Sequence, residues 1–166
     1  MSTTLRKVAV ALALSAAVGT YALSQQFVLR QPRQQLDTEL MVSLPPLVQV
    51  VMAAGDRYLA ANLATWRVLV ATTGKLDAAK AAVQGIVQRD AAWMNPAHED
   101  NYYVAAAILP WNGRVADAQY VLGRAMQARA RDMWPGFYYA FNVYFFDKDA
   151  QRAAQILMDE AVKADT

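Results

Sequence analysis

The residue types that carry most enzyme chemistry are scarce in this 166-residue sequence. It has no cysteine, which excludes disulfides, thiolate nucleophiles and thiolate metal sites, and its single histidine is His98. His98 is followed by Glu99 and Asp100, but adjacent side chains on a helix diverge by about 100° and do not converge on one metal ion. The sequence has no glycine-rich phosphate loop and no serine–histidine–aspartate set. We therefore expect no catalytic residue, metal site or cofactor, and interpret His98 as an exposed residue at a helix start.

Composition and charge narrow the class of protein. Apolar residues make up 56% and charged residues 18%, which excludes intrinsic disorder. Seven glycines and six prolines are few for a β-sandwich or a collagen-like chain. Without the first 29 residues, which carry Arg6 and Lys7, basic and acidic side chains are equal in number. A nucleic-acid-binding domain would show a basic excess, so no nucleic acid partner is expected.

The N-terminal segment, residues 1–33, resembles a membrane anchor. Residues 8–29 carry no charge, and as a helix they would span about 33 Å, close to the roughly 30 Å hydrocarbon core of a bilayer. The alternative is a signal peptide cleaved after Ala22-Leu23-Ser24. Two stripes of small residues could pack this helix against another in the bilayer, although the alanine-rich composition alone could produce them. These stripes contain Ala9, Ala13 and Ala17, and Ala11, Ser15 and Gly19.

The positive charges that flank residues 8–29 slightly favour a cytoplasmic N-terminus. Arginine exceeds lysine and alanine is abundant, a composition associated with GC-rich bacterial genomes. The predicted location is therefore a bacterial inner membrane, crossed once, with the C-terminal domain in the periplasm.

The remainder of the chain has the pattern of an all-α domain. Residues 34–46 form a linker that ends at Pro45-Pro46, and residues 47–166 form the domain. Apolar residues at helical spacing and turn signals predict six helices, with Trp134-Pro135-Gly136 as a break before the fifth. The predicted helices cover residues 47–70, 76–89, 96–109, 115–131, 137–146 and 149–163. Single aspartates at helix starts are expected to cap them or to complement the helix dipole; they are Asp37, Asp56, Asp77, Asp117 and Asp149.

An internal repeat is the most informative feature. The segments that start at Gly74, Gly113 and Lys148 each continue with an early aspartate and an alanine five positions after the first residue. A period of about 35–39 residues with one helical hairpin per repeat is typical of an α-solenoid. The alanines at the shared position, Ala79, Ala118 and Ala153, are expected where two helices cross closely.

The middle repeat resembles a tetratricopeptide repeat (TPR). The residues that carry this resemblance are Tyr102, Gly113, Arg114, Asp117, Ala118, Leu122 and Ala125, and Asn95-Pro96 resembles the junction that precedes many such repeats. The resemblance covers about residues 55–164 and implies a short α-solenoid of about three hairpins with a concave surface for extended peptides or helices. A plain bundle of six helices around one axis is the alternative.

Aromatic residues concentrate in residues 134–146 and occupy every side of the predicted helix. Either core packing takes up most of these rings, or one face binds a partner. The candidate partner-binding residues are Tyr102, Tyr103, Trp111, Tyr138, Tyr139 and Phe146.

The expected function is therefore a membrane-anchored scaffold for protein–protein interaction, or an accessory subunit of a membrane or envelope complex, without catalysis. The alternatives are a secreted periplasmic binding protein after signal cleavage and a structural subunit of a multi-protein membrane complex. The protein partner itself is not identified by the sequence.

Overall fold

The computed structural model describes residues 3–30, 43–72 and 76–164. The chain forms two compact units, Met1–Gln35 and Leu36–Thr166. Throughout the described residues the regular structure is helical and no strand occurs. The all-α part of the predicted fold class is confirmed.

The first unit contains helix α1 (Thr3–Arg30), and here the predicted membrane anchor is contradicted. Among the described residues, no helix is both long enough and apolar enough to cross a membrane. Helix α1 is long enough, with 28 residues, so it fails the requirement for apolar character. Polar side chains interrupt its second half, where the hydroxyls of Thr20 and Ser24 donate to the carbonyls of Ala16 and Tyr21.

The same finding overturns two further predictions. Residues 8–29 are not a transmembrane span, so the predicted single-pass location in a bacterial inner membrane with a periplasmic domain is wrong. The small-residue stripes lose their predicted role in packing within a bilayer. Ala13, Ala17 and Gly19 are exposed on α1, whereas the side chain of Ala9 lies outside the described residues.

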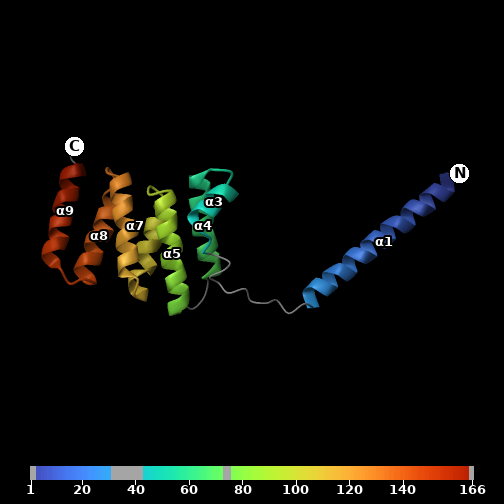
Figure 1. Ribbon diagram of the computed structural model, residues 1–166, viewed down its shortest axis with the longest axis horizontal. Helices are drawn as coiled ribbons and strands as arrows, with labels where there is room; N and C mark the ends of the chain where they lie inside the picture. The colour runs from blue at the N-terminus through green and yellow to red at the C-terminus, as the bar shows by residue number, and fades with distance from the viewer. Residues whose placement is uncertain (1–2, 31–42, 73–75, 165–166) are drawn as a thin grey trace. The chain divides into compact units, whose positions relative to one another are not determined.

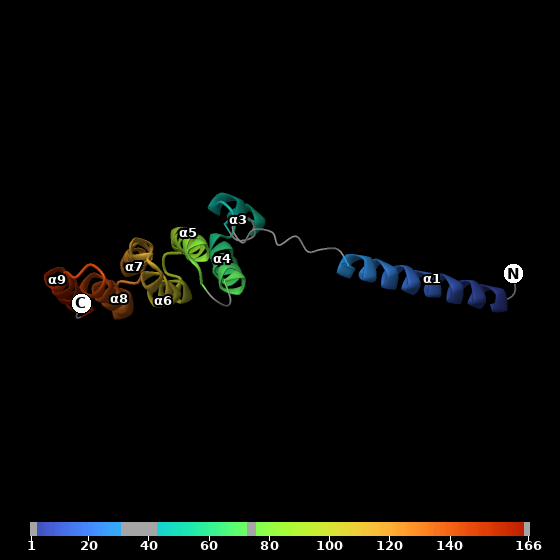
Figure 2. The ribbon, with the colours of Figure 1, turned by 90° about the horizontal axis from the view of Figure 1, so that it is seen from below.

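The second unit is a row of helical hairpins (Figure 1). Its elements are α3 (Pro46–Met52), α4 (Arg57–Ala71), α5 (Ala78–Met94), α6 (Glu99–Ile108), the 3₁₀ turn η1 (Pro110–Asn112), α7 (Val115–Ala128), α8 (Met133–Phe145) and α9 (Ala150–Ala164). Helices α4–α5, α6–α7 and α8–α9 pack as three antiparallel pairs, and α5 and α7 join each pair to the next. Figure 2 shows α4, α6 and α8 in one layer and α5 and α7 in the other. The hairpins therefore stack in sequence order, not around one central axis.

Two corners of the repeat share a backbone conformation. Gly113 has a φ of 75° and Lys148 a φ of 60°, so both adopt the left-handed conformation that follows a helix end. Lysine at this position carries strain that glycine would avoid. This shared geometry supports the predicted equivalence of positions 113 and 148, whereas Gly74 lies outside the described residues.

Polar N-caps place several helix starts. Asp56 accepts from the amides of Tyr58 and Leu59, and Asp77 accepts from the amide of Lys80. Asp56 also marks an interruption that the sequence pattern missed, because Ala54 and Gly55 have positive φ angles and separate α3 from α4. Asp37 lies outside the described residues.

The predicted break at Trp134-Pro135-Gly136 is wrong. These residues form the first turn of α8, which Asp132 caps by accepting from the Trp134 amide at 3.1 Å. Proline is compatible with this position because the first amides of a helix have no intrahelical acceptor.

Small residues set the helix crossings, although not at all three predicted alanines. Ala118 is fully buried and Ala153 is 4% exposed, but Ala79 lies on the solvent side of α5. In α4 the buried side consists mostly of alanines, and several larger residues of the predicted apolar pattern face outward. The exposed ones are Tyr58, Leu59, Leu63, Trp66 and Val70.

Gly85 allows α7 to approach α5. A Cβ at this position would lie 2.6 Å from Oδ2 of Asp117, a buried carboxylate that pairs with Arg89 and Arg114. We expect Gly85→Ala to lower the free energy of unfolding by about 1 kcal/mol, because displacement of a buried, paired carboxylate outweighs the gain in helix propensity.

Gly123 in α7 is the matched control for this substitution. A Cβ there would make an ordinary 3.7 Å contact with the Tyr139 ring, so Gly123→Ala should stabilise the protein by about 0.5–1 kcal/mol. Urea unfolding of both variants measures the two effects. Stabilisation by Gly85→Ala would mean that Asp117 has room to move.

Candidate functional site

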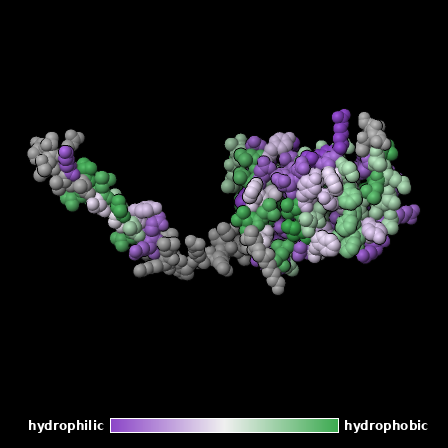
Figure 3. Space-filling model, turned by 180° about the vertical axis from the view of Figure 1, so that it is seen from behind, coloured by the Kyte–Doolittle hydropathy of each residue, from purple (hydrophilic) through white to green (hydrophobic). Residues whose placement is uncertain are grey.

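An apolar groove of about 480 Å³ lies between α6 and α8, the first helices of the second and third hairpins. Its lining is aromatic and aliphatic except for one amide, and Nδ2 of that amide, Asn142, already donates to the Tyr138 carbonyl at 3.0 Å. The lining residues are Tyr103, Ala106, Ala107, Trp111, Phe137, Tyr138, Phe141 and Asn142. The face drawn in Figure 3 is mixed in hydropathy, with green and pale green atoms beside white and purple ones over the helical hairpins.

Ring contacts hold the groove walls while leaving large side chains accessible. Tyr103 of α6 meets Tyr138 of α8 edge-on, with 5.8 Å between ring centroids. At the other end, Trp111 contacts Phe146 at 5.0 Å. Trp111 is still 58% exposed and Phe141 39% exposed. The rings thus form a preorganised apolar surface, part of which remains exposed to solvent outside the core.

A set of polar contacts, called the clasp below, links the start of α8 to α6; it consists of Tyr102, Arg129 and Asp132. The Tyr102 hydroxyl donates to Oδ2 of Asp132 at 2.9 Å, and Nε of Arg129 donates to the same oxygen at 2.8 Å. Arg129 also pairs with Glu99 at the start of α6. Burial opposes ionisation of Asp132, but hydrogen bonds from Arg129, the Trp134 amide and Tyr102 hold its pKa below the ordinary range. Burial raises the pKa of Tyr102, so its hydroxyl remains a donor.

The six predicted partner-binding residues fall into different environments. Three of them, Tyr103, Trp111 and Tyr138, line the groove. Phe146 flanks Trp111 at its edge. Tyr102 is only 1% exposed and belongs to the core between α6 and α7.

Tyr139 lies outside the groove and packs against the neighbouring core clusters, while Arg152 donates to its hydroxyl at 3.4 Å. Two groove residues, Phe137 and Phe141, were missed as binding candidates. Their spacing of four residues places them on one side of α8, a signal the sequence contains.

His98 is not the exposed residue that was expected. It is half-buried and caps α6, with Nδ1 accepting from the Asn101 amide at 3.4 Å. This bond requires the neutral ring, so Nε2 carries the hydrogen. Burial lowers the pKa of His98, and the nearby Asp100 carboxylate partly offsets this effect.

A pH dependence follows from this cap. Because the folded state binds the proton less well than the unfolded state, the free energy of unfolding should fall as the pH drops below 6.5. Protonation also places a positive charge at the positive end of α6. In His98→Asn, which keeps a cap but does not titrate, urea unfolding between pH 7.5 and pH 5 should show a smaller pH dependence. An unchanged dependence would exclude His98 as its source.

Within the described residues, no group of three or more histidine, aspartate and glutamate side chains is placed to hold a metal ion. No model of a known protein family matches the chain, and no curated protein or solved structure is significantly similar to it.

Proposed function

We propose that the helical-hairpin unit is a non-catalytic protein-binding module of the TPR-like type, which holds a segment of another protein in the groove between α6 and α8. The observation that carries this proposal is the groove itself, where exposed aromatic side chains converge from two hairpins. Full burial of one large apolar side chain contributes about 1.5–3 kcal/mol to the binding free energy. Two or three such side chains of a partner would therefore contribute several kcal/mol.

The groove chemistry favours a protein segment over a polar metabolite. A small polar molecule needs several convergent hydrogen-bonding groups to orient it. The groove offers few, and Nδ2 of Asn142 is engaged with the Tyr138 carbonyl. Apolar side chains of a peptide instead need contact area, which Trp111, Phe137 and Phe141 supply.

The hairpin architecture supports the TPR-like assignment. The hairpins pack in sequence order, and Gly113 and Lys148 form equivalent left-handed corners. Helices α4, α6 and α8 share one layer (Figure 2), and the two grooves lie between successive helices of that layer. Stacked hairpins of this kind bind extended segments across such a surface.

Selection of random peptides of about 12 residues against the full chain tests the proposal. Enriched sequences should contain aromatic or aliphatic anchors. Calorimetric titration of a selected peptide should show at least tenfold weaker binding to Phe141→Glu. Trp93→Glu, at an aromatic residue 54% exposed on α5 and outside the groove, should bind within about twofold of the parent.

Two outcomes would overturn the proposal. One is failure to enrich any peptide above background. The other is equal weakening by Phe141→Glu and Trp93→Glu, which would indicate non-specific adhesion to exposed aromatic residues.

A further inference from the structure

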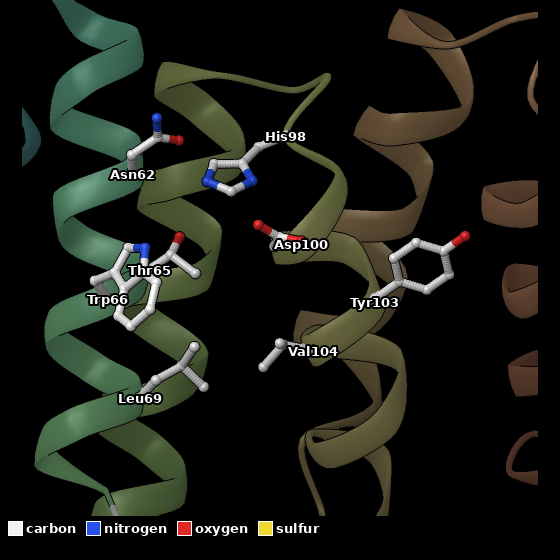
Figure 4. A pocket seen from close by; sticks show the side chains of 8 residues that line it. All are labelled: Asn62, Thr65, Trp66, Leu69, His98, Asp100, Tyr103 and Val104. Atoms are coloured by element: carbon white, nitrogen blue, oxygen red, sulfur yellow. The ribbon is translucent and has the colours of Figure 1, made fainter.

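A second groove lies on the other side of α6 and differs in chemistry. It has a volume of about 400 Å³, and its walls come from α4 and the start of α6. The lining residues, drawn in Figure 4, are Asn62, Thr65, Trp66, Leu69, His98, Asp100, Tyr103 and Val104. Tyr103 also lines the apolar groove, so the two sites are adjacent.

Asp100 gives this second groove its charge. Its side chain is exposed, and within the described part of the chain it forms no ion pair with a lysine or arginine. The neighbouring acid, Glu99, differs because Arg129 neutralises it at 3.1 Å. Among the described lining residues of the two grooves, Asp100 is the only carboxylate and there is no lysine or arginine.

Two further groups line the same groove. The indole of Trp66, on the α4 wall, is 68% exposed and offers an aromatic face. Nε2 of His98 is buried and has no hydrogen-bond partner within the described residues. Since Nδ1 is used by the cap, Nε2–H is a donor that lacks an acceptor. Figure 4 shows the His98 ring directed from the start of α6 toward Asn62, with Trp66 farther along α4.

The chemistry that suits the two accessible groups, the Asp100 carboxylate and the Trp66 indole, is an arginine residue within a peptide. A guanidinium pairs with a carboxylate in a planar, bidentate geometry and stacks on an indole ring. A carboxylate or phosphate ligand would instead be repelled by Asp100.

We propose that the groove between α4 and α6 binds an arginine side chain of the same protein segment whose apolar residues occupy the groove between α6 and α8. This inference rests on the proposed function, and it adds that the bound segment of the partner carries a positive charge. Packed helices are about 8–10 Å apart, and an extended chain advances about 3.3 Å per residue. The arginine should therefore lie about three residues from the nearest apolar anchor.

The test uses a peptide from the selection described above and its citrulline analogue, which keeps the shape of arginine but removes the charge. For the parent protein, citrulline should weaken binding at least tenfold. For Asp100→Asn, the arginine and citrulline peptides should bind within about twofold of each other. Glu99→Gln, which alters the adjacent carboxylate, should retain the tenfold preference for arginine.

The outcomes separate the two proposals. Selected peptides without arginine, or equal binding of the arginine and citrulline peptides while Phe141→Glu still weakens both, overturn the arginine site and leave the apolar groove intact. Retention of the arginine preference in Asp100→Asn also overturns it. Absence of any selected peptide overturns both.

Discussion

Replacement of Asp132 by alanine is expected to lower the free energy of unfolding by about 2–4 kcal/mol. Loss of the α8 cap costs about 1 kcal/mol. The substitution also leaves the buried Tyr102 hydroxyl without its acceptor and removes an ion pair of Arg129, which adds about 1–3 kcal/mol. Urea unfolding at pH 7 measures this change.

Asp149→Ala is the matched control for Asp132→Ala. Asp149 also accepts an amide hydrogen bond at a helix start, from Arg152 at 2.9 Å, but it is exposed, and among the described residues its side chain forms no ion pair. Its loss should cost about 1 kcal/mol. Equal effects of the two substitutions would show that the clasp adds nothing to the cap.

The Asp132 effect should depend on pH in a defined direction. The pKa of Asp132 is lower in the folded state than its ordinary value of 3.8, so its ionisation contributes stability above that pH. This contribution is lost in acid. The difference in stability between the parent protein and Asp132→Ala should therefore be smaller at pH 3 than at pH 7.

Replacement of Ala118 by leucine is expected to cost about 1–3 kcal/mol. Ala118 is fully buried in the core cluster that joins α6 and α7. Three additional carbon atoms would push these helices apart or force strained side-chain conformations. Since α7 also packs against α5 and α8, a shift of this helix disturbs both neighbouring hairpins.

Ala79→Leu controls for the substitution type, because this alanine occupies the corresponding repeat position but is exposed. Thermal or urea unfolding should place Ala79→Leu within about 0.5 kcal/mol of the parent protein. If Ala118→Leu unfolds with the parent's stability, Ala118 does not set the crossing of these helices.

Local sequence signals predicted much of the helical architecture. Helical periodicity and the turn at Gly113 predicted the hairpin of α6 and α7, and the recurrence at Lys148 predicted the next. These features depend on residues close in sequence, so pattern analysis can find them. Asp56 and Asp77 were likewise recognisable as caps because the capped amides lie within three residues.

Features that depend on contacts between distant residues were not predictable. Tyr102 and Tyr103 are adjacent aromatic residues, yet Tyr102 is core and Tyr103 lines the groove. The partner of Tyr102 is Asp132, 30 residues away. The outward side of α4 was also hidden, because its alanines pack inward while larger residues such as Trp66 remain exposed.

The predicted membrane anchor failed for a different reason. Residues 8–29 carry no charge, but polar side chains occupy the second half of that stretch. Uncharged polar residues such as Ser24, Gln25 and Gln26 also lower the apolar character of a helix, and within the described residues no helix meets the requirement for a span.

The groove between α6 and α8 is tested most directly by photo-crosslinking to a selected peptide. Phe141 and, in a separate variant, Trp93 are each replaced by p-benzoylphenylalanine, and crosslinked peptide is measured by mass spectrometry after illumination. The groove proposal predicts a crosslink from position 141 and none from position 93 on α5. A crosslink from position 93 with none from position 141 would contradict it.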